Sequence, residues 1–307
     1  MNIKKNALPA IAVLLAAALL AGCAATQATD NKWGMDKLVI VLLPGEDSEQ
    51  VAYTRNVFDE ALSEALGMPV EEYHADSYSA AIEAMRTGRA HVAQLGPFAY
   101  VHAVDRAEAE CFATVGVGGA FGYYSQIITH ADSDIYTLDD LKGRDFGFVD
   151  PESASGNIVP SNEILAHFGG LYPDLSFDDL HINGKFFASV MFTGNHANSV
   201  QGVYMKDVEA AAVASSTLTN QIKNGLVDEA KIRVVYTSPL IPSGPLSMRK
   251  DMPEDLKKTI ALFFYEWDDE EFWTSRYPAA PDSRYCPVDD SAYDYIRELR
   301  DKYDLSD

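Results

Sequence analysis

The sequence predicts an α/β fold built from two lobes. Runs rich in β-branched and apolar residues alternate with segments of helical spacing from residue 37 onward. This alternation occurs twice in series, and the 307 residues are enough for two lobes at roughly 100–200 residues per domain. Strands that alternate with helices through short turns are typical of parallel sheets. We therefore expect two α/β units, each built on a parallel sheet.

The first series alternates strand and helix and breaks at Pro44-Gly45 and again at Gly96-Pro97. Its elements are expected at residues 37–43, 48–66, 70–73, 79–86 and 91–95, in the order strand, helix, strand, helix, strand.

The second series repeats the pattern further along the chain. Its strands are expected at residues 123–129, 145–149, 208–213 and 233–236, and its helices at 138–141, 160–168 and 217–224. Helices rich in acidic and aromatic residues then follow to the C-terminus.

Charge and cysteine content exclude several classes of protein. The 46 acidic residues outnumber the 24 basic ones, so the formal charge of −22 leaves no basic surface for a nucleic-acid backbone. Three Cys in a chain of this length cannot form a disulfide framework, and no Cys-x-x-Cys occurs. Whether Cys111 and Cys286 pair or remain two separate thiols stays open.

The N-terminus has the pattern of an export signal. Lys4 and Lys5 precede an apolar run over residues 7–20, which is too short and wrongly flanked for a membrane span. The ending Leu20-Ala21-Gly22-Cys23 resembles that of bacterial lipoproteins, in which the Cys is lipidated. We expect a signal peptide at 1–22, a lipid anchor on Cys23, a tether over 23–35 and an extracytoplasmic protein held to a bacterial membrane. The alternative is an ordinary signal peptide with an incidental Cys.

A serine-rich turn is the strongest candidate for a binding site. The expected strand at 145–149 opens into Asp150-Pro151-Glu152-Ser153-Ala154-Ser155-Gly156, just before a helix. Such a turn directs free backbone N–H groups and two hydroxyls at one point, where the helix dipole favours an anion. The alternative is structural, with Ser153 or Ser155 capping its own helix.

Several short motifs, in order, resemble one family, the substrate-binding proteins of phosphate, phosphite and phosphonate ABC importers. The match covers most of the chain after the tether. The motifs are Leu95-Gly96-Pro97 with Tyr100 and Ala103, Gly122-Tyr123-Tyr124-Ser125, the run from Leu138 to Gly143, Asp150-Pro151 with the serine turn and Pro160, Gly194 with His196, and Ser238-Pro239-Leu240-Ile241-Pro242.

The resemblance implies a type II periplasmic-binding-protein fold. Two crossing strands, near residues 124–128 and 234–238, would join the lobes and leave a ligand cleft between them. Residues 36–125 and 236–307 would form lobe 1, and residues 126–235 would form lobe 2.

The resemblance also implies the ligand-binding residues. They are Tyr78, Tyr123, Ser153, Ser155, Gly156 and His196. The family's Ser-Thr-Ser triplet has Ala154 in its middle here, so one hydroxyl donor is missing. His196, expected in a loop, would donate to the anion, and better when protonated, because a nearby oxyanion raises the pKa of a histidine. From the residues alone, without the family resemblance, we would interpret Tyr78 and Tyr123 as core aromatic residues. His196 would then be a structural or exposed side chain.

The function expected from these features is binding. The protein would be a monomeric lipoprotein that captures a small phosphorus oxyanion and delivers it to an ABC permease, without a cofactor, a metal or enzymatic turnover. One alternative is a receptor domain that presents the same ligands to a membrane sensor. Another is an enzyme on the same scaffold that uses His196 as a base.

Two departures from the family concern the tail of the ligand. Members that bind aminoalkylphosphonates place acidic residues at positions that fall here on Gly244 and Ser216. Neither residue carries a negative charge, so we expect a preference for ligands without an amine. Glu209 or Asp207 could compensate from the neighbouring strand.

Overall fold

The computed structural model describes residues 31–45 and 48–306. The chain divides into two units, residues 1–36 and residues 37–307, and the fold described below is that of the second unit. The expected signal peptide, Cys23 and most of the expected tether lie outside the described residues. Within the part of the chain that the structure describes, no helix is long and apolar enough to cross a membrane.

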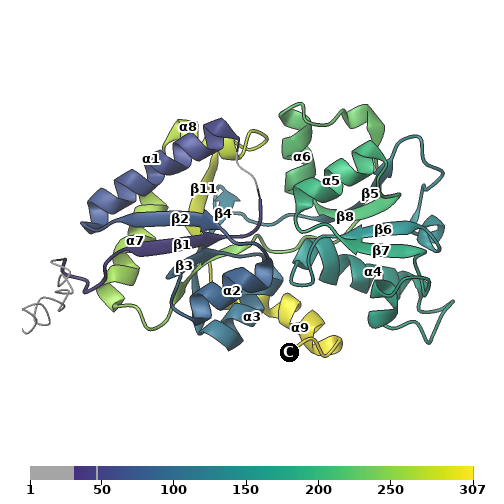
Figure 1. The fold of residues 1–307 in the computed structure, drawn as a ribbon, viewed down its shortest axis with the longest axis horizontal. Helices are drawn as coiled ribbons and strands as arrows, with labels where there is room; N and C mark the ends of the chain where they lie inside the picture. Colours follow the sequence, from purple (N-terminus) through teal and green to yellow (C-terminus); the bar gives the residue numbers. More distant parts are fainter. Residues whose placement is uncertain (1–30, 46–47, 307) are drawn as a thin grey trace, which may run out of the picture. The chain divides into compact units, whose positions relative to one another are not determined.

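Six strands form the first sheet, in the order β11-β4-β10-β3-β1-β2 (Figure 1). They are β1 (Leu38–Leu42), β2 (Val70–His74), β3 (Val92–Gln94), β4 (Ala109–Val117), β10 (Pro245–Arg249) and β11 (Ser283–Pro287). β1 is parallel to β2 and β3, whereas β10 is antiparallel to β3 and β4, and β11 is antiparallel to β4. The sheet is therefore mixed, and the expectation of a purely parallel sheet was wrong.

Helices cover both faces of this sheet (Figure 1). They are α1 (Glu49–Leu66), α2 (Tyr78–Arg86), α3 (Pro97–Ala107), α7 (Glu254–Glu266), α8 (Glu270–Arg276) and α9 (Asp294–Lys302). Local signals set the ends of α1, because the side chain of Ser48 accepts from the N–H of Val51 and Gly67 ends the helix with a left-handed φ of 66°. We call this sheet and its helices the first lobe.

Five strands form the second sheet, in the order β7-β6-β8-β5-β9. They are β5 (Ser125–His130), β6 (Asp145–Phe148), β7 (Ser189–Phe192), β8 (Ala210–Ala214) and β9 (Ile232–Thr237). β6 is parallel to β7 and β8, but β5 is antiparallel to both β8 and β9, so this sheet is mixed as well.

The helices of the second sheet are α4 (Val159–Phe168), α5 (His196–Met205) and α6 (Ser215–Lys223), and together they form the second lobe. The segment Leu138–Leu141 is a single 3₁₀ turn rather than the expected α-helix. It is closed by a capping box between Thr137 and Asp140, which favours a short turn at this point.

Two segments connect the sheets, residues 118–124 and residues 238–244. They run antiparallel, and Tyr123 and Ile241 exchange backbone hydrogen bonds of 3.0 and 2.9 Å. The two expected crossing strands are present, a few residues from the expected positions. Two paired connections of this kind hold the lobes while leaving a cleft between them.

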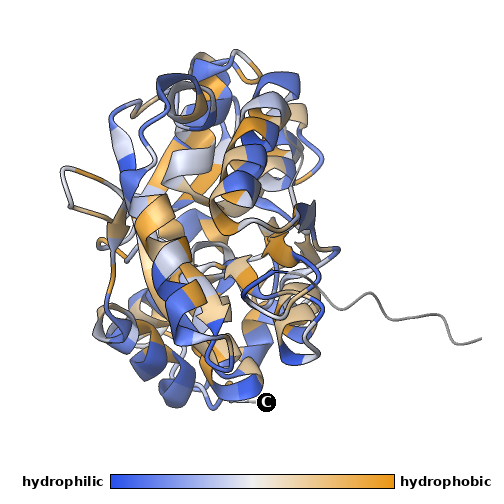
Figure 2. Cartoon of the chain, turned by 90° about the vertical axis from the view of Figure 1, so that its left-hand side faces the viewer, coloured by the Kyte–Doolittle hydropathy of each residue, from blue (hydrophilic) through white to orange (hydrophobic). Residues whose placement is uncertain are grey.

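Apolar residues of the serine turn belong to the core of the first lobe. Val149, Ala154 and Ile158 pack in one cluster with Tyr78, Phe98 and other residues of α2 and α3. In Figure 2 orange hydrophobic residues alternate with blue hydrophilic ones along the helices, as expected for helices that cover a sheet on one side. The turn, which follows β6 of the second lobe, is therefore anchored by packing against the first lobe.

Cys111 on β4 and Cys286 on β11 are both free thiols. Their sulfurs contact the backbone oxygens of Val288 and Thr114, and partial burial raises the pKa of both thiols. Of the two possibilities left open by the sequence, the structure contains separate thiols.

Candidate oxyanion site

The serine turn links the end of β6 to the start of α4. Residues Ala154–Ile158 form a π-helical turn in which the N–H of Ile158 donates to the carbonyl oxygen of Ser153 at 3.1 Å. The N–H of Gly156 donates to the Oγ of Ser153 at 3.0 Å. Ser153 is therefore a helix cap, as the structural alternative expected, and its hydroxyl proton is still available to a second acceptor.

Gly156 is required for packing at this point. A Cβ atom there would lie 2.4 Å from Val149, which sits at the end of β6 on the opposite side of the turn. Its N–H is already donated to Ser153. Gly156 thus shapes the turn around the two serines.

Asp150 ties the turn to the first lobe. One carboxylate oxygen accepts from the N–H of Glu152 at 2.8 Å, and the other accepts from the N–H of Tyr78 at 3.4 Å, at the start of α2. Burial raises the pKa of this carboxyl group. Tyr78 and the serine turn are consequently held in a fixed relation.

His196 is the first residue of helix α5, so its expected place in a loop was wrong. The side chain of Asn195 caps this helix by accepting from the N–H of Asn198 at 2.8 Å. The Nε2 atom of His196 lies 3.5 Å from the Oγ atoms of both Ser153 and Ser155. The imidazole therefore lies within reach of both serine hydroxyls.

The protonation state of His196 follows from its other nitrogen. The backbone N–H of Ala214 points at the Nδ1 atom at 3.0 Å, and a backbone N–H can only donate. Nδ1 is therefore unprotonated and Nε2 carries the proton. Desolvation by burial lowers the pKa of His196 to about 4. His196 is thus a neutral donor, and the expectation that it acts better when protonated is corrected.

This partly buried histidine should make folding sensitive to acid. The pKa of about 4 in the folded protein lies below the ordinary 6.5, so between these values the unfolded chain binds more protons. The stabilising contribution is complete above pH 6.5 and is lost as the pH falls toward 4. Relative to His196→Gln, the wild type should lose about 1–2 kcal/mol of unfolding free energy over this range in urea titrations. A difference that does not change with pH would contradict the assignment.

Two tyrosine hydroxyls complete the cluster. Tyr78 is hydrogen-bonded to Ser153 and Tyr123 to Ser155. Desolvation raises the pKa of both phenols, that of Tyr123 to about 12, so both are neutral donors at physiological pH. The ring of Tyr78 packs in the core of the first lobe, as expected of a core aromatic residue. Its hydroxyl group is hydrogen-bonded to Ser153.

These groups meet in a cleft of about 470 Å³ between the two lobes. Four of the six expected ligand-binding residues line it, whereas Ser155 is fully buried and Gly156 lies behind the turn. None of the described residues that line the cleft is acidic, although the protein carries 46 Asp and Glu. The site therefore offers neutral hydrogen-bond donors to an anion and no carboxylate to repel it.

The model of one protein family matches residues 40–293, and its description is "ABC transporter, phosphonate, periplasmic substrate-binding protein". The chain belongs to this family. It is a family of transport binding proteins rather than enzymes. The resemblance carried by the sequence motifs is thereby confirmed.

Two relatives and one solved structure support the assignment. The chain is 31% identical over 216 residues to the phosphonates-binding periplasmic protein of Escherichia coli, a match that spans 68% of this chain and 60% of that protein. It is 27% identical to a phosphate-import protein of Mycolicibacterium smegmatis over 97% of this chain and 95% of the relative. A binding protein of an ABC phosphonate transporter from Pseudomonas aeruginosa is 25% identical, with a TM-score of 0.74 over 88% of this chain and 87% of that one.

Both positions at which the sequence analysis expected a departure from the family, Ser216 and Gly244, line the cleft. Ser216 lies in the first turn of α6 and Gly244 precedes β10. A Cβ atom at Gly244 would lie 2.1 Å from the backbone oxygen of Leu95, so the backbone leaves no room for any side chain. No carboxylate is present at either position.

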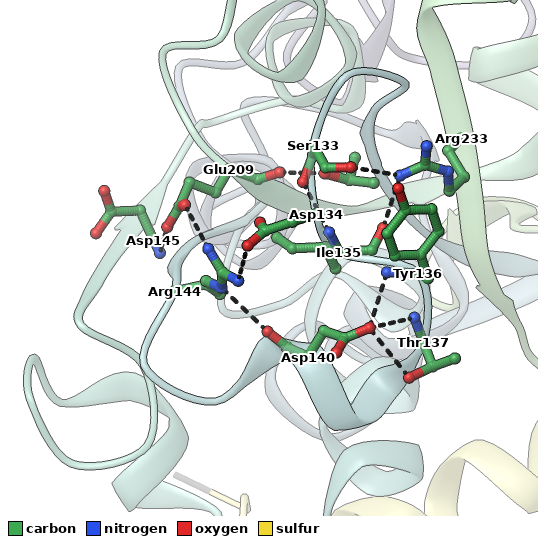
Figure 3. A network of polar contacts seen from close by, with 11 residues as sticks. Ser133, Asp134, Ile135, Tyr136, Thr137, Asp140, Arg144, Asp145, Glu209 and Arg233 are labelled. Carbon is green, nitrogen blue, oxygen red and sulfur yellow. Dashed lines mark hydrogen bonds and ion pairs between the residues drawn. The ribbon is translucent and has the colours of Figure 1, made fainter.

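Glu209 does not compensate for these departures. It accepts from Arg144 at 3.2 Å and from the N–H of Asp145 at 2.9 Å, in a network of the second lobe (Figure 3). Neither Glu209 nor Asp207 lines the cleft. The suggestion that one of them replaces the missing acid is therefore not supported.

Sequence reasoning missed four polar residues at the other end of the cleft. They are Arg55, His74, Gln94 and Arg276. They come from α1, β2, β3 and α8, and no motif connects segments so far apart in the chain. The pairing of β1 with β2 and with β3 places His74 and Gln94 in one sheet, and Arg55 reaches His74 from helix α1.

Proposed function

We propose that the protein is the receptor of an ABC importer and captures a small phosphorus oxyanion, a phosphonate, phosphite or phosphate, in the cleft between its lobes. The observation that carries the proposal is the convergence of five neutral donors. Four of them line the cleft, the hydroxyls of Tyr78, Tyr123 and Ser153 and the Nε2–H of His196, and the fifth, the hydroxyl of Ser155, is buried next to this imidazole.

Neutral donors suit an anion that must be released again. Each hydrogen bond to a charged acceptor stabilises the complex by about 1.5–3 kcal/mol. Among the described residues, the side chains of Ser153 and Ser155 contact His196 and a backbone N–H rather than a Lys or Arg that would form a tight ion pair with the anion. The donors come from both lobes, with Tyr78 on α2 of the first and Ser153 and His196 on the second. A bound anion would therefore favour the closed arrangement, which the permease would recognise.

The relatives support the choice of ligand. One of them is named for phosphonates and the other for phosphate import. Both ligands present a tetrahedral phosphorus with several oxygen acceptors, which matches donors that converge from several directions.

The finer expectations belong to the same proposal. Cys23 would carry the lipid that anchors the protein outside the cytoplasmic membrane, and the receptor would act as a monomer. Its lobes would divide at the expected boundaries, 36–125 with 236–307 and 126–235. The second candidate function is that of a receptor domain of a membrane sensor. Deletion of the permease gene that neighbours the gene of this protein, followed by measurement of ligand uptake, would distinguish the two functions.

The geometry opposes the enzymatic alternative. A general base needs a free lone pair, but the Nδ1 of His196 accepts from Ala214 and its Nε2 is protonated. Among the described residues, no group of three His, Cys, Asp or Glu could hold a metal ion.

Calorimetry together with ³¹P NMR tests the proposed function. Methylphosphonate, phosphite and phosphate should be titrated into the purified protein, and the mixtures followed by NMR for hours. We expect one-to-one binding of at least one of these ligands and an unchanged phosphorus spectrum. No heat with any of them would overturn the binding proposal, and a new phosphorus species would show an enzyme.

Aminated ligands should bind more weakly than ligands without an amine. An ammonium group in the closed cleft would meet no carboxylate among the described lining residues and would lie near Arg276. Burial of an unpaired charge costs several kcal/mol, so 2-aminoethylphosphonate should bind at least about tenfold more weakly than methylphosphonate. Side-by-side calorimetry measures this. Tighter binding of the aminated ligand would show that a carboxylate reaches the cleft after all.

Single substitutions in the donor cluster should weaken oxyanion binding by about 1–3 kcal/mol each, for Ser153→Ala, Ser155→Ala and His196→Ala. Two further variants separate the roles of the imidazole nitrogens. His196→Gln places an amide donor near the Nε2 position and should retain more affinity, whereas His196→Asn can satisfy only the N–H of Ala214. Equal losses in the two variants would argue against the Nε2–H as the donor.

A further inference from the structure

A buried carboxylate holds the serine turn outside the cleft. Glu152 directly precedes Ser153, but it is not among the residues that line the cleft. One of its carboxylate oxygens contacts the Nδ1 of His102, and the other accepts from the Nη1 of Arg106 at 3.3 Å. Both partners lie on α3 of the first lobe, one helical turn apart. Glu152 therefore ties the turn, which follows β6 of the second lobe, to a helix of the first.

His102 is fixed through both of its ring nitrogens. Its Nε2 lies 2.7 Å from the backbone oxygen of Leu305, which can only accept, so Nε2 carries a proton. Its Nδ1 is hydrogen-bonded to the carboxyl group of Glu152. His102 and Glu152 are both buried, so water and salt screen this contact little. The imidazole thus links the serine turn to a residue at the C-terminal end of the chain.

The end of helix α9 places the backbone oxygen of Leu305. Asp304 has a left-handed φ of 54°, and its N–H donates to the carbonyl oxygen of Asp301 at 3.3 Å. The N–H of Leu305 donates to the carbonyl oxygen of Arg300 at 3.0 Å. These two bonds form a Schellman motif, and the side chain of Leu305 packs against the core of the first lobe. A defined helix end therefore fixes the position of the His102 ring.

The same helix end also contacts the second lobe. The Nζ of Lys302 and the hydroxyl of Tyr303 both donate to the Oδ1 of Asn162 on α4, each at 2.8 Å. The ring centroids of Tyr303 and Phe177, which lies in the loop after α4, are 4.9 Å apart. We call residues 302–305 the C-terminal segment. It lies at the end of α9, close to both α3 and α4 (Figure 1).

These contacts hold the chain on both sides of the two serines. Glu152 directly precedes Ser153, and Asn162 lies in the first turn of α4, after Ser155. Donors that are held in place before the ligand arrives lose less entropy on binding. A misplacement of about 1 Å in a binding group can cost up to about a hundredfold. The contacts at Glu152 and Asn162 can therefore influence affinity although neither residue lines the cleft.

We propose that His102 and Glu152 are positioning residues for the oxyanion. Together with the C-terminal segment, they hold the serine turn against α3 in the shape that binds the ligand. This inference rests on the proposed function, because it requires the ligand to bind at the serine turn. It adds to that function a contact between the lobes that sets affinity from outside the cleft.

Two substitutions of His102 separate its two hydrogen bonds. His102→Asn places an amide donor near the Nδ1 position and can keep the bond to Glu152, whereas His102→Gln places it near the Nε2 position and can keep the bond to Leu305. In calorimetry with methylphosphonate, His102→Gln should bind at least about tenfold more weakly than the wild type, and His102→Asn within about threefold of it. Urea unfolding without ligand should show similar stability for the two variants, because each loses the ring and one hydrogen bond.

Glu152→Gln tests the same contact from the serine turn. An amide oxygen accepts more weakly than a carboxylate, so affinity for methylphosphonate should fall by about threefold to tenfold. His167→Gln is the matched control. The Nε2 of His167 on α4 contacts the carboxylate of Asp139 at 2.7 Å, but both residues belong to the second lobe. This variant should leave affinity within about twofold of the wild type.

The outcomes separate this inference from the proposed function. Lower stability with wild-type affinity in both His102→Gln and Glu152→Gln would show a purely structural contact and overturn the inference. Equal affinity losses in the two His102 variants would overturn the role of the bond to Glu152. Tighter binding by His102→Gln would show that the contact opposes the ligand-bound shape, and would overturn the inference as well.

Should His102→Gln fail to fold, Glu152→Gln decides, and wild-type affinity in that variant overturns the inference. All of these results leave the oxyanion receptor intact. A wild type that binds none of methylphosphonate, phosphite and phosphate would instead overturn the proposed function, and this inference with it.

Discussion

A variant with both Ser153→Ala and Ser155→Ala is expected to lose nearly all affinity for phosphorus oxyanions. Each serine hydroxyl donates to a charged acceptor, and removal of one such donor costs about 1–3 kcal/mol. Together the losses amount to about 2–6 kcal/mol, or roughly 30-fold to 10⁴-fold in affinity, with some deviation from additivity because the two side chains share His196. Tyr78 and Tyr123 also lose their partners.

Calorimetry measures the loss, and thermal unfolding without ligand measures stability. Ser161→Ala is a matched control on the adjacent helix α4, because the hydroxyl of Ser161 is buried and has no hydrogen-bond partner among the described residues. It should change neither affinity nor unfolding temperature by much. If the double variant unfolds readily but binds as tightly as the wild type, the serines serve only as helix caps.

Gly156→Ala is expected to damage both stability and binding. The added methyl group would lie 2.4 Å from Val149 and 2.9 Å from the Oγ of Ser153, both of which are buried. Forcing a methyl group into a packed site costs about 1–3 kcal/mol. The strain would be relieved by a shift of the turn, which would move both serines away from His196. We therefore expect an affinity loss of at least about tenfold in addition to the lower stability.

Chemical denaturation and calorimetry on the same samples test this prediction. Gly170→Ala is the control, because an added Cβ there would meet nothing within 4 Å. It should leave binding unchanged and stability within about 0.5 kcal/mol. Wild-type affinity in Gly156→Ala would mean that the turn can move without consequence and that its exact shape does not matter for the ligand.

Local sequence signals were sufficient for the first lobe's leading elements and for the serine turn. Helix α1 begins at its Ser48 cap and ends at Gly67, and both signals lie within a few residues of the ends they define. The serine turn could be predicted because all its donors are contiguous between β6 and α4. Ser153 can cap the helix and still donate to a ligand. Its hydroxyl oxygen accepts from the N–H of Gly156, while its hydroxyl proton stays available.

Strand order could not be predicted from local patterns. β10 and β11 are each five residues long and pair with β4, which lies more than a hundred residues earlier in the chain. The sequence patterns predicted neither strand, and they therefore did not predict that the first sheet is mixed. Short strands are stabilised mainly by their partners, and the sequence does not state which partners those are.

The sequence by itself determined the alternation of strands and helices, the family, and the serine turn with its candidate donors Tyr78, Tyr123 and His196. Tertiary structure alone decided the charge of His196, because the N–H that occupies its Nδ1 comes from Ala214, eighteen residues away. It also decided the arginine end of the cleft, where α1 and α8 place Arg55 and Arg276 from distant parts of the chain. The physical reason is common to both: hydrogen bonding, burial and charge depend on neighbours in space, and folding brings these neighbours together from segments that carry no shared local signal.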